Sequence, residues 1–222
     1  MSEKSLSNQR TRRSRSSVTA DEILEAAERV SVDGFEALTM RAVATEIGAS
    51  PMALYRYFAT KDELVDALLD RVLGRIELQP PTDDWLADLA QFARAHRQIL
   101  AQHPWAIVPL FTHSNPGINA TGIGEAALRI LNRGGITGGA AVATFCGILA
   151  VNYGWSAFTF ARDALPSDID PTEALGAALG ALPADRFPLT LSVASEMANY
   201  GSDAHYNLVL TQLMAGIEAV AA

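Results

Sequence analysis

Apolar residues recur every three or four positions through most of the chain, the spacing that places them on one face of an α-helix. Over residues 20–32 they share such a face, and Thr19 and Glu22 have the spacing of a capping box at its start. Gly34 is a suitable end for this helix, because glycine tolerates the left-handed conformation found there. Sustained alternation at period two, the mark of strands, is absent from the sequence. We therefore expect an all-α fold.

Two shorter helices are predicted next, with a tight turn at Gly48 between them. Thr39 has the position of an N-cap for a helix over 40–47, and Ser50 has that position for a helix over 51–58. The second of these helices is too short to be stable alone, so the others must support it. Two amphipathic helices joined by such a turn indicate a helix-turn-helix, whose second helix fits the major groove of DNA.

The rest of the chain also shows helical patterns, separated by Gly, Pro and capping residues. A fourth helix is predicted from Thr60 to Pro80-Pro81. Further helices are expected at 83–101, after Pro104, at 115–133, 137–163, from Asp170-Pro171, at 189–199 and from Ser202 to the C-terminus.

The chain has 222 residues and a formal net charge of −8, which by itself argues against binding to nucleic acid. The charge is unevenly distributed, however: residues 1–18 carry +4 and residues 62–222 carry −9. DNA contact is therefore expected near the N-terminal end, and the basic tail itself reads as disordered and not as a secretory signal. Cys146 is the single cysteine, so an internal disulfide is impossible and a reducing cytoplasm is the simplest location.

The exposed face of the predicted recognition helix offers small, apolar, aromatic and basic groups. Small apolar side chains suit thymine methyl groups, while Arg, Lys, Thr and Tyr side chains suit phosphates or guanine. The candidate DNA contacts on this helix are Pro51, Met52, Ala53, Tyr55 and Arg56. Thr39 and Arg41 at the preceding helix, and Lys61 at the start of the fourth, are candidates for phosphate contacts.

The residues of this segment also carry a family resemblance. Residues 34–44, 47–50, 54–58 and 61–64 resemble the tetracycline-repressor (TetR) family, and the similarity covers about 19–70. It implies a homodimeric repressor that binds a palindromic double-stranded DNA operator and a small organic effector. The implied division is a tail (1–18), a helix-turn-helix domain (19–62) and a helical ligand-binding and dimerisation domain (63–222).

The resemblance adds Tyr57 as a DNA contact, although packing is an alternative role for it. Many relatives have a polar residue where Met52 or Ala53 stands in this sequence. Specificity is therefore expected to depend more on Arg41, Arg56 and DNA shape.

Residues 138–161 contain no charged side chain, a length that also fits a membrane span. Their Ala, Gly, Ser and Thr content and Asn152 favour a buried helix and no membrane. In a TetR-like dimer this helix and the last one would form an intermolecular bundle. The expected interface residues are Ala140, Ala143, Gly147 and Ala150 with Tyr206, Leu210, Leu213 and Ile217.

Aromatic and polar side chains in the middle helices are candidates for an effector pocket, with core packing as the alternative. They are His103, Trp105, Phe111, His113, Asn152 and Trp155. The four histidines lack paired metal-ligand spacing and no Gly-rich phosphate loop occurs, so neither an enzyme nor a cofactor is expected. A regulator without any ligand, whose body serves dimerisation or protein contacts, remains the alternative.

Overall fold

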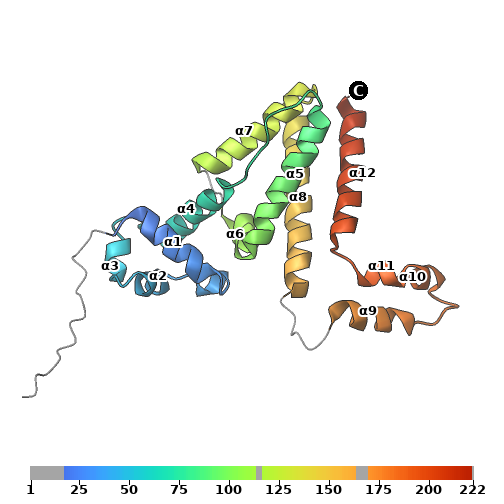
Figure 1. Ribbon diagram of the computed structural model, residues 1–222, viewed down its shortest axis with the longest axis horizontal. Helices are drawn as coiled ribbons and strands as arrows, with labels where there is room; N and C mark the ends of the chain where they lie inside the picture. The colour runs from blue at the N-terminus through green and yellow to red at the C-terminus, as the bar shows by residue number, and fades with distance from the viewer. Residues whose placement is uncertain (1–17, 114–116, 164–169, 222) are drawn as a thin grey trace, which may run out of the picture. The chain divides into compact units, whose positions relative to one another are not determined.

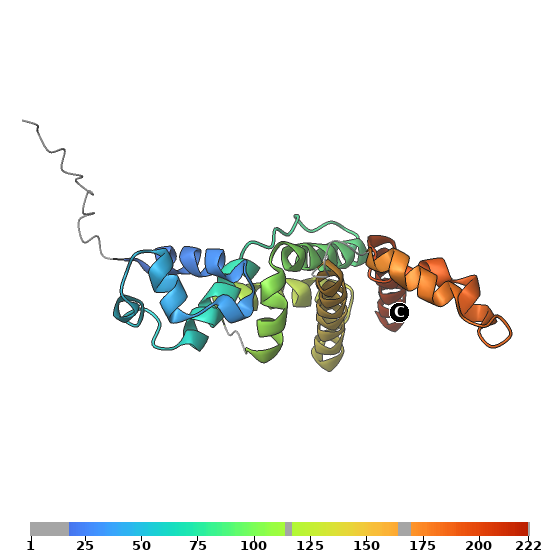
Figure 2. The same ribbon diagram turned by 90° about the horizontal axis from the view of Figure 1, so that it is seen from below.

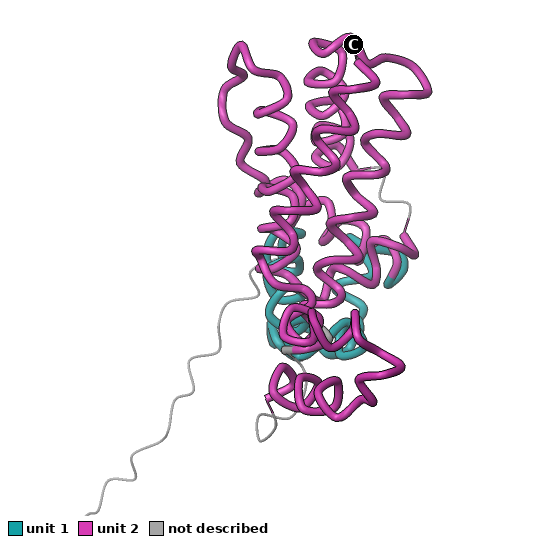
Figure 3. The backbone as a smooth tube through the Cα atoms, turned by 90° about the vertical axis from the view of Figure 1, so that its right-hand side faces the viewer, with its two compact units in different colours: residues 1–61 teal, residues 62–222 magenta. Residues whose placement is uncertain are grey.

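The structure is a computed structural model that describes residues 18–113, 117–163 and 170–221. Over these ranges it consists of helices joined by turns, with no strand (Figure 1). It divides into two compact units, residues 1–61 and 62–222 (Figure 3). The predicted all-α fold is confirmed. The disorder predicted for the basic tail concerns residues that, apart from Val18, lie outside the described ranges.

The first helix of the first unit, α1 (Ala20–Ser31), begins as the sequence predicts. The Glu22 amide donates to the Thr19 hydroxyl at 3.2 Å, and the Thr19 amide donates to the Glu22 carboxylate at 2.9 Å. This reciprocal capping box satisfies two amides that a helix start leaves without an intrahelical partner. A 3-10 turn, η1 (Phe35–Ala37), then leads to Leu38, which is fully buried.

The helices α2 (Met40–Glu46) and α3 (Pro51–Leu54) complete the first unit, and α2 packs against both α1 and α3. The Ala42 amide donates to the Thr39 hydroxyl at 3.1 Å, which confirms Thr39 as the N-cap of α2. Each helix contributes apolar side chains with no exposed surface, among them Ile23, Ala27, Val43 and Leu54.

The helix predicted to read DNA, α3, is shorter than expected. It ends at Leu54 and not at Phe58, because the amides of Tyr57 and Phe58 both donate to the Leu54 carbonyl, at 2.9 and 3.0 Å, and close the last turn. Ser50 forms no side-chain capping bond, contrary to the prediction, although Pro51 does occupy the first turn. Phe58 is nevertheless buried, as predicted.

The fourth helix, α4 (Lys61–Leu73), also ends early, at Leu73 and not near Pro80, and Gly74 follows it in a turn. The Gly74 amide donates to the Asp70 carbonyl at 2.9 Å, and a Cβ at position 74 would lie 2.8 Å from Cγ of Asn119. A side chain at this position would therefore collide with a distant part of the chain, a constraint that the apolar spacing does not reveal.

Four long helices build the second unit: α5 (Trp85–Gln102), α7 (Ile118–Arg133), α8 (Gly138–Asp163) and α12 (Asp203–Ala221). The central one is α5, which packs against α7, α8 and α12. It is capped by Asp84, one residue later than predicted, whose carboxylate accepts from the Ala87 amide at 2.9 Å.

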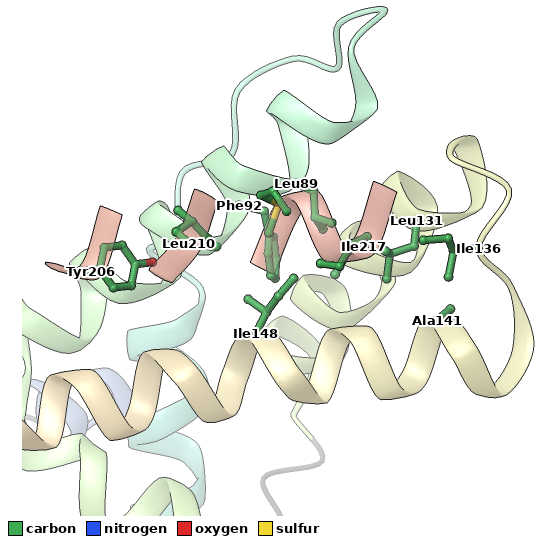
Figure 4. Close-up of a cluster of buried hydrophobic side chains, with 12 residues drawn as sticks. Leu89, Phe92, Leu131, Ile136, Ala141, Ile148, Tyr206, Leu210 and Ile217 are labelled. Atoms are coloured by element: carbon green, nitrogen blue, oxygen red, sulfur yellow. The ribbon is translucent and has the colours of Figure 1, made fainter. Parts of the chain in front are cut away.

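The core of this unit forms where the four helices face one another (Figure 4). The side chains that meet there are Leu89 and Phe92 from α5, Leu131 from α7, Ile148 from α8, and Tyr206, Leu210 and Ile217 from α12. Because Tyr206, Leu210 and Ile217 fill the core of their own chain, the predicted role of these three residues in a dimer interface is wrong.

Shorter helices connect the long ones. Between α5 and α7 lie η2 (Pro104–Ala106) and α6 (Ile107–Thr112). Before α12 lie α9 (Pro171–Gly180), α10 (Pro188–Ser192) and α11 (Ala194–Ala198), with α9 packed against α10 and α11 (Figure 2). The helix predicted over 189–199 is thus two pieces. The predicted start of α7 at Asn115-Pro116 lies outside the described residues.

Candidate nucleic-acid interface and ligand cavity

The turn between α2 and α3 is fixed by Gly48, whose φ of +66° lies in the left-handed region. The Gly48 amide donates to the Thr45 carbonyl at 3.1 Å, and the Ala49 amide donates to the Ala44 carbonyl at 2.9 Å. These two bonds form a Schellman motif, which satisfies carbonyls at the end of α2. The left-handed backbone of Gly48 therefore sets the direction in which the chain leaves α2 and enters α3.

The short helix α3 and the turn after it carry large side chains that remain in solvent. Met52 is 71% exposed, Tyr55 is 45% exposed and Tyr57 is 41% exposed. Exposed apolar groups gathered on so short a segment mark an interaction surface. Because α3 ends at Leu54, Tyr55 and Tyr57 extend from the following turn and not from the helix itself.

The nine predicted DNA contacts all lie in this unit. The exposed ones are Thr39, Arg41, Pro51, Met52, Tyr55, Arg56 and Tyr57, while Ala53 and Lys61 are half-buried. We define these nine residues as the α2–α3 face.

Hydrogen-bond donors on the α2–α3 face are held in different ways. The Thr39 oxygen accepts from Ala42, which leaves its own O–H group able to donate to a phosphate. The Lys61 ammonium lies 4.7 Å from the centre of the Phe35 ring, a cation–π contact that steadies it. For Arg41 and Arg56 the described residues provide no hydrogen-bond partner, so both guanidinium groups are available.

The α2–α3 face itself carries three cations and no acidic side chain, although the whole chain is acidic. Between residues 38 and 61 the sequence has one acidic side chain, Glu46. Its carboxylate is 2.8 Å from the Nε of Arg29 on α1, so its charge is balanced. A phosphate backbone would therefore meet Arg41 and Arg56 without a neighbouring free carboxylate in this segment, whereas Lys61 is followed directly by Asp62 and Glu63.

In the second unit, Asn152 is part of a buried polar network. Its amide nitrogen donates to the Ala93 carbonyl at 2.8 Å and lies 3.1 Å from Nδ1 of His96, and its oxygen accepts from the Tyr206 hydroxyl at 2.9 Å. Both amide hydrogens are used, so His96 Nδ1 must accept and the His96 proton must be on Nε2. The network links α5, α8 and α12.

Burial also determines how this network titrates. Burial lowers the pKa of His96 from 6.5 to about 4, because the charged imidazolium loses its hydration. Burial is also the main cause that raises the pKa of Tyr206 above its ordinary value. Both residues are therefore neutral at pH 7, which agrees with the hydrogen bonds they form with Asn152.

The other predicted ligand contacts do not converge on one site. His103 ends α5, with Nε2 3.5 Å from an Arg75 nitrogen, and Trp105 beside it is buried. Phe111 is exposed on α6, and its ring centre lies 5.1 Å from that of Tyr153. His113 and Trp155 are bonded elsewhere: Nδ1 of His113 is 2.9 Å from Asp66, and the Trp155 indole donates to the Gly201 carbonyl at 3.0 Å.

A cavity of about 270 Å³ lies between α5, the η2–α6 segment and α8. We call it the α5–α8 cavity. It is lined mostly by apolar side chains, with Leu100, Ile107 and Phe160 among them, and by Arg97 and Ser156. None of the six predicted ligand contacts lines it, although Pro104, which does, lies between His103 and Trp105 in the sequence. Nothing in the sequence marks Ser156 as a residue of a ligand cavity, because serine is common on apolar helices.

A second cavity, of about 360 Å³, lies between α5, α7 and the segment before α5. Its lining includes Phe92 and the ion pair of Asp88 with Arg133, 2.7 Å apart. The Arg133 guanidinium holds the pKa of Asp88 below its ordinary value. Across the described ranges, no three His, Cys, Asp or Glu side chains are grouped so that they could hold a metal ion.

A helix-turn-helix unit followed by a larger helical body with cavities between its helices is typical of one class of proteins, the helix-turn-helix regulators. Residues 23–68 match the family described as bacterial regulatory proteins, tetR family, and residues 78–221 match the tetracyclin repressor-like C-terminal domain. The second match covers more than half of the chain, so the protein belongs to the TetR family.

Several relatives agree with this assignment. The chain is 40% identical over 93 residues to the HTH-type transcriptional repressor DrrR1 of Streptomyces coeruleorubidus, covering 40% of this chain and 34% of that protein. It is 32% identical over 136 residues to an HTH-type transcriptional regulator of Saccharopolyspora erythraea, covering 58% of each. The chain thus spans about a third to three fifths of the length of these curated relatives.

Similarity of fold extends over nearly the whole chain. The crystal structure of ActR, a TetR family protein of Streptomyces coelicolor, in complex with actinorhodin superposes with a TM-score of 0.83 at 24% identity, covering 93% of this chain and 99% of ActR. The family and the fold class predicted from the sequence are therefore confirmed. TetR family members are transcription regulators and not enzymes, as predicted.

Proposed function

We propose that this protein is a transcriptional repressor that binds a palindromic operator as a homodimer and is released by a small organic effector. The α2–α3 face carries the DNA-binding part of the proposal, because it combines exposed Tyr and Met side chains with three cations. The relatives DrrR1 and ActR, named as a repressor and as a protein bound to actinorhodin, support the repressor and effector parts.

Dimerisation is supported by the exposed apolar faces of α8 and α12. On α8, Val142, Cys146 and Ala150 follow one another at helical spacing and are exposed, and on α12 Leu208 and Ala215 do so. The segment Gly138–Phe160 is long and apolar enough to cross a membrane, and 22% of its most apolar window is buried in the chain.

A second copy of the chain explains this exposed face better than lipid does. The opposite face of the same helix holds Asn152 and Ser156 in the protein interior, and α8 packs against α5 and α7. A single span with this content would also need other helices to satisfy its polar groups. The proposal therefore places the protein in the cytoplasm.

The DNA-binding part is tested with operators selected from a pool of random duplex DNA. We expect palindromes with half-sites about one helical turn, roughly 34–36 Å, apart. An Arg41→Ala, Tyr55→Phe double variant should bind the selected operator about 10- to 100-fold more weakly at moderate salt, because two phosphate or groove contacts are lost.

The matched control is Arg129→Ala, which removes an exposed arginine of α7 that pairs with Glu125. It should bind with wild-type affinity. Wild-type affinity in the Arg41, Tyr55 double variant, measured by fluorescence anisotropy at several salt concentrations, would refute the role of the α2–α3 face.

A further inference from the structure

The α5–α8 cavity contains a buried polar group without a partner. Ser156 is 5% exposed, and its hydroxyl oxygen forms no hydrogen bond with any described residue. Such a hydroxyl is unusual, because buried polar groups are nearly always paired and an unpaired one lowers stability. A hydroxyl at the wall of a cavity is satisfied when a ligand brings an oxygen to it.

The same cavity is lined by the guanidinium group of Arg97, which forms only one weak ion pair within the described ranges. Nη2 of Arg97 donates to the carboxylate of Asp203 at 2.6 Å, and its guanidinium carbon lies 4.1 Å from the centre of the Tyr206 ring. Asp203 is 82% exposed, so its contact with Arg97 is a weak surface ion pair that water can replace. The remaining N–H groups of Arg97 have no hydrogen-bond partner among the described residues.

The walls and the volume limit the rest of the ligand. Leu100, Ile107 and Phe160 offer apolar surface, which favours a hydrophobic ring system. A cavity of about 150 Å³ holds benzene, so about 270 Å³ suits a molecule of roughly a dozen heavy atoms.

We propose that the α5–α8 cavity binds a compact aromatic monocarboxylate, with its carboxylate on Arg97, its ring between Leu100, Ile107 and Phe160, and one oxygen of that carboxylate accepting from Ser156. The carboxylate takes the place of Asp203, which returns to water. This inference rests on the effector-binding part of the proposed function and identifies the chemical class of the effector.

The experiment measures binding to the full chain by calorimetry at pH 7.5, with 2-naphthoate as the probe and 2-naphthamide as its neutral counterpart. We expect 2-naphthoate to bind at least about tenfold more tightly, because a bidentate bond from Arg to a carboxylate is stronger than a bond to an amide. Arg97→Gln should abolish this preference. Arg129→Gln, which alters an arginine that lines the second cavity and not the α5–α8 cavity, should keep it.

The variant Ser156→Ala tests the contact with the ligand without changing the stability of the fold. Because the hydroxyl has no partner in the free protein, this variant should be as stable as the wild type yet bind both probes about fivefold more weakly. Equal affinity for the two probes, no measurable binding of either, or a carboxylate preference that survives Arg97→Gln would overturn the proposal.

Operator binding without any probe, measured on the same samples, separates this inference from the proposed function. A wild-type protein that binds its operator but not 2-naphthoate refutes the carboxylate site and leaves the repressor intact. A protein that binds 2-naphthoate but selects no operator refutes the repressor and leaves the site.

Discussion

At the scale of single residues, Gly48 controls the geometry of the DNA-binding unit. Its backbone has a φ of +66°, and a Cβ built there meets no atom within 4 Å. The requirement for glycine is therefore conformational and not steric, since an L-residue loses free energy in the left-handed region wherever it is placed.

Gly48→Ala should destabilise the first unit by about 1 kcal/mol and lower operator affinity, because α3 would lose its defined direction. Gly48→Asn should cost less, since Asn tolerates this conformation. The matched control is Gly122→Ala in α7, where a Cβ would also meet no atom within 4 Å. Because Gly122 has helical backbone, this substitution should stabilise the chain by about 0.5–1 kcal/mol. Thermal denaturation measures all three, and equal effects of Gly48→Ala and Gly122→Ala would contradict this account.

His96 makes stability depend on pH. Its pKa is about 4 when folded and 6.5 when unfolded, so between these values the unfolded chain binds a proton that the folded chain does not. The free energy of unfolding should therefore fall as the pH decreases below about 6.5, by about 2 kcal/mol between pH 7.5 and 5. Urea denaturation measures it, and His96→Gln should flatten the dependence. An unchanged slope in that variant would assign the effect to other groups.

At the scale of helices, α8 has two different faces. One face carries Asn152 and Ser156, one turn apart and both buried, and the other carries exposed apolar residues. Asn152 joins α8 to α5 and α12 through three hydrogen bonds, whereas Ser156 joins α8 to nothing among the described residues. Two neighbouring polar residues on one helix therefore have opposite effects on stability.

Asn152→Ala should lower the free energy of unfolding by about 2–4 kcal/mol, because it leaves the Ala93 carbonyl, His96 and the Tyr206 hydroxyl without their shared partner. Ser156→Ala should change it by less than about 0.5 kcal/mol or raise it. Chemical denaturation of the two variants provides the comparison. Similar losses in both would mean that Ser156 has a partner after all.

At the scale of the whole molecule, the proposed dimer depends on the exposed apolar surfaces of α8 and α12. Leu208 is 56% exposed and Val142 is 54% exposed, whereas Leu210, two residues from Leu208, is buried in the core of its own chain. A hydrophobic face of this kind on a regulator is expected to be self-complementary in a two-fold dimer.

The double variant Val142→Glu, Leu208→Glu should be a folded monomer in sedimentation. Its affinity for the palindromic operator should be far weaker, because a monomer binds one half-site whereas a dimer binds two linked half-sites at once. Leu210→Glu should instead unfold the chain, since it buries a charge without a partner. Circular dichroism distinguishes the two results. A dimer that survives the double substitution would exclude α8 and α12 as the interface.

The α2–α3 segment and most helix starts were predictable from the sequence because their causes are local. Thr19 with Glu22, Thr39, Gly48 and Asp170 act on atoms a few residues away, so their spacing is sufficient. The nine candidate DNA contacts followed from the same local order, together with the family resemblance, and their role in DNA binding stays a prediction.

What only the tertiary structure decided depends on neighbours far along the chain. Gly74 ends α4 where Asn119 approaches, Leu210 belongs to the core and not to a dimer surface, and Asn152 is held by α5 and α12. The position of Ser156 and Arg97 on the walls of one cavity likewise depends on how distant helices pack. Helical periodicity shows that a helix has an apolar face, but which partner covers that face is settled only when distant segments pack together.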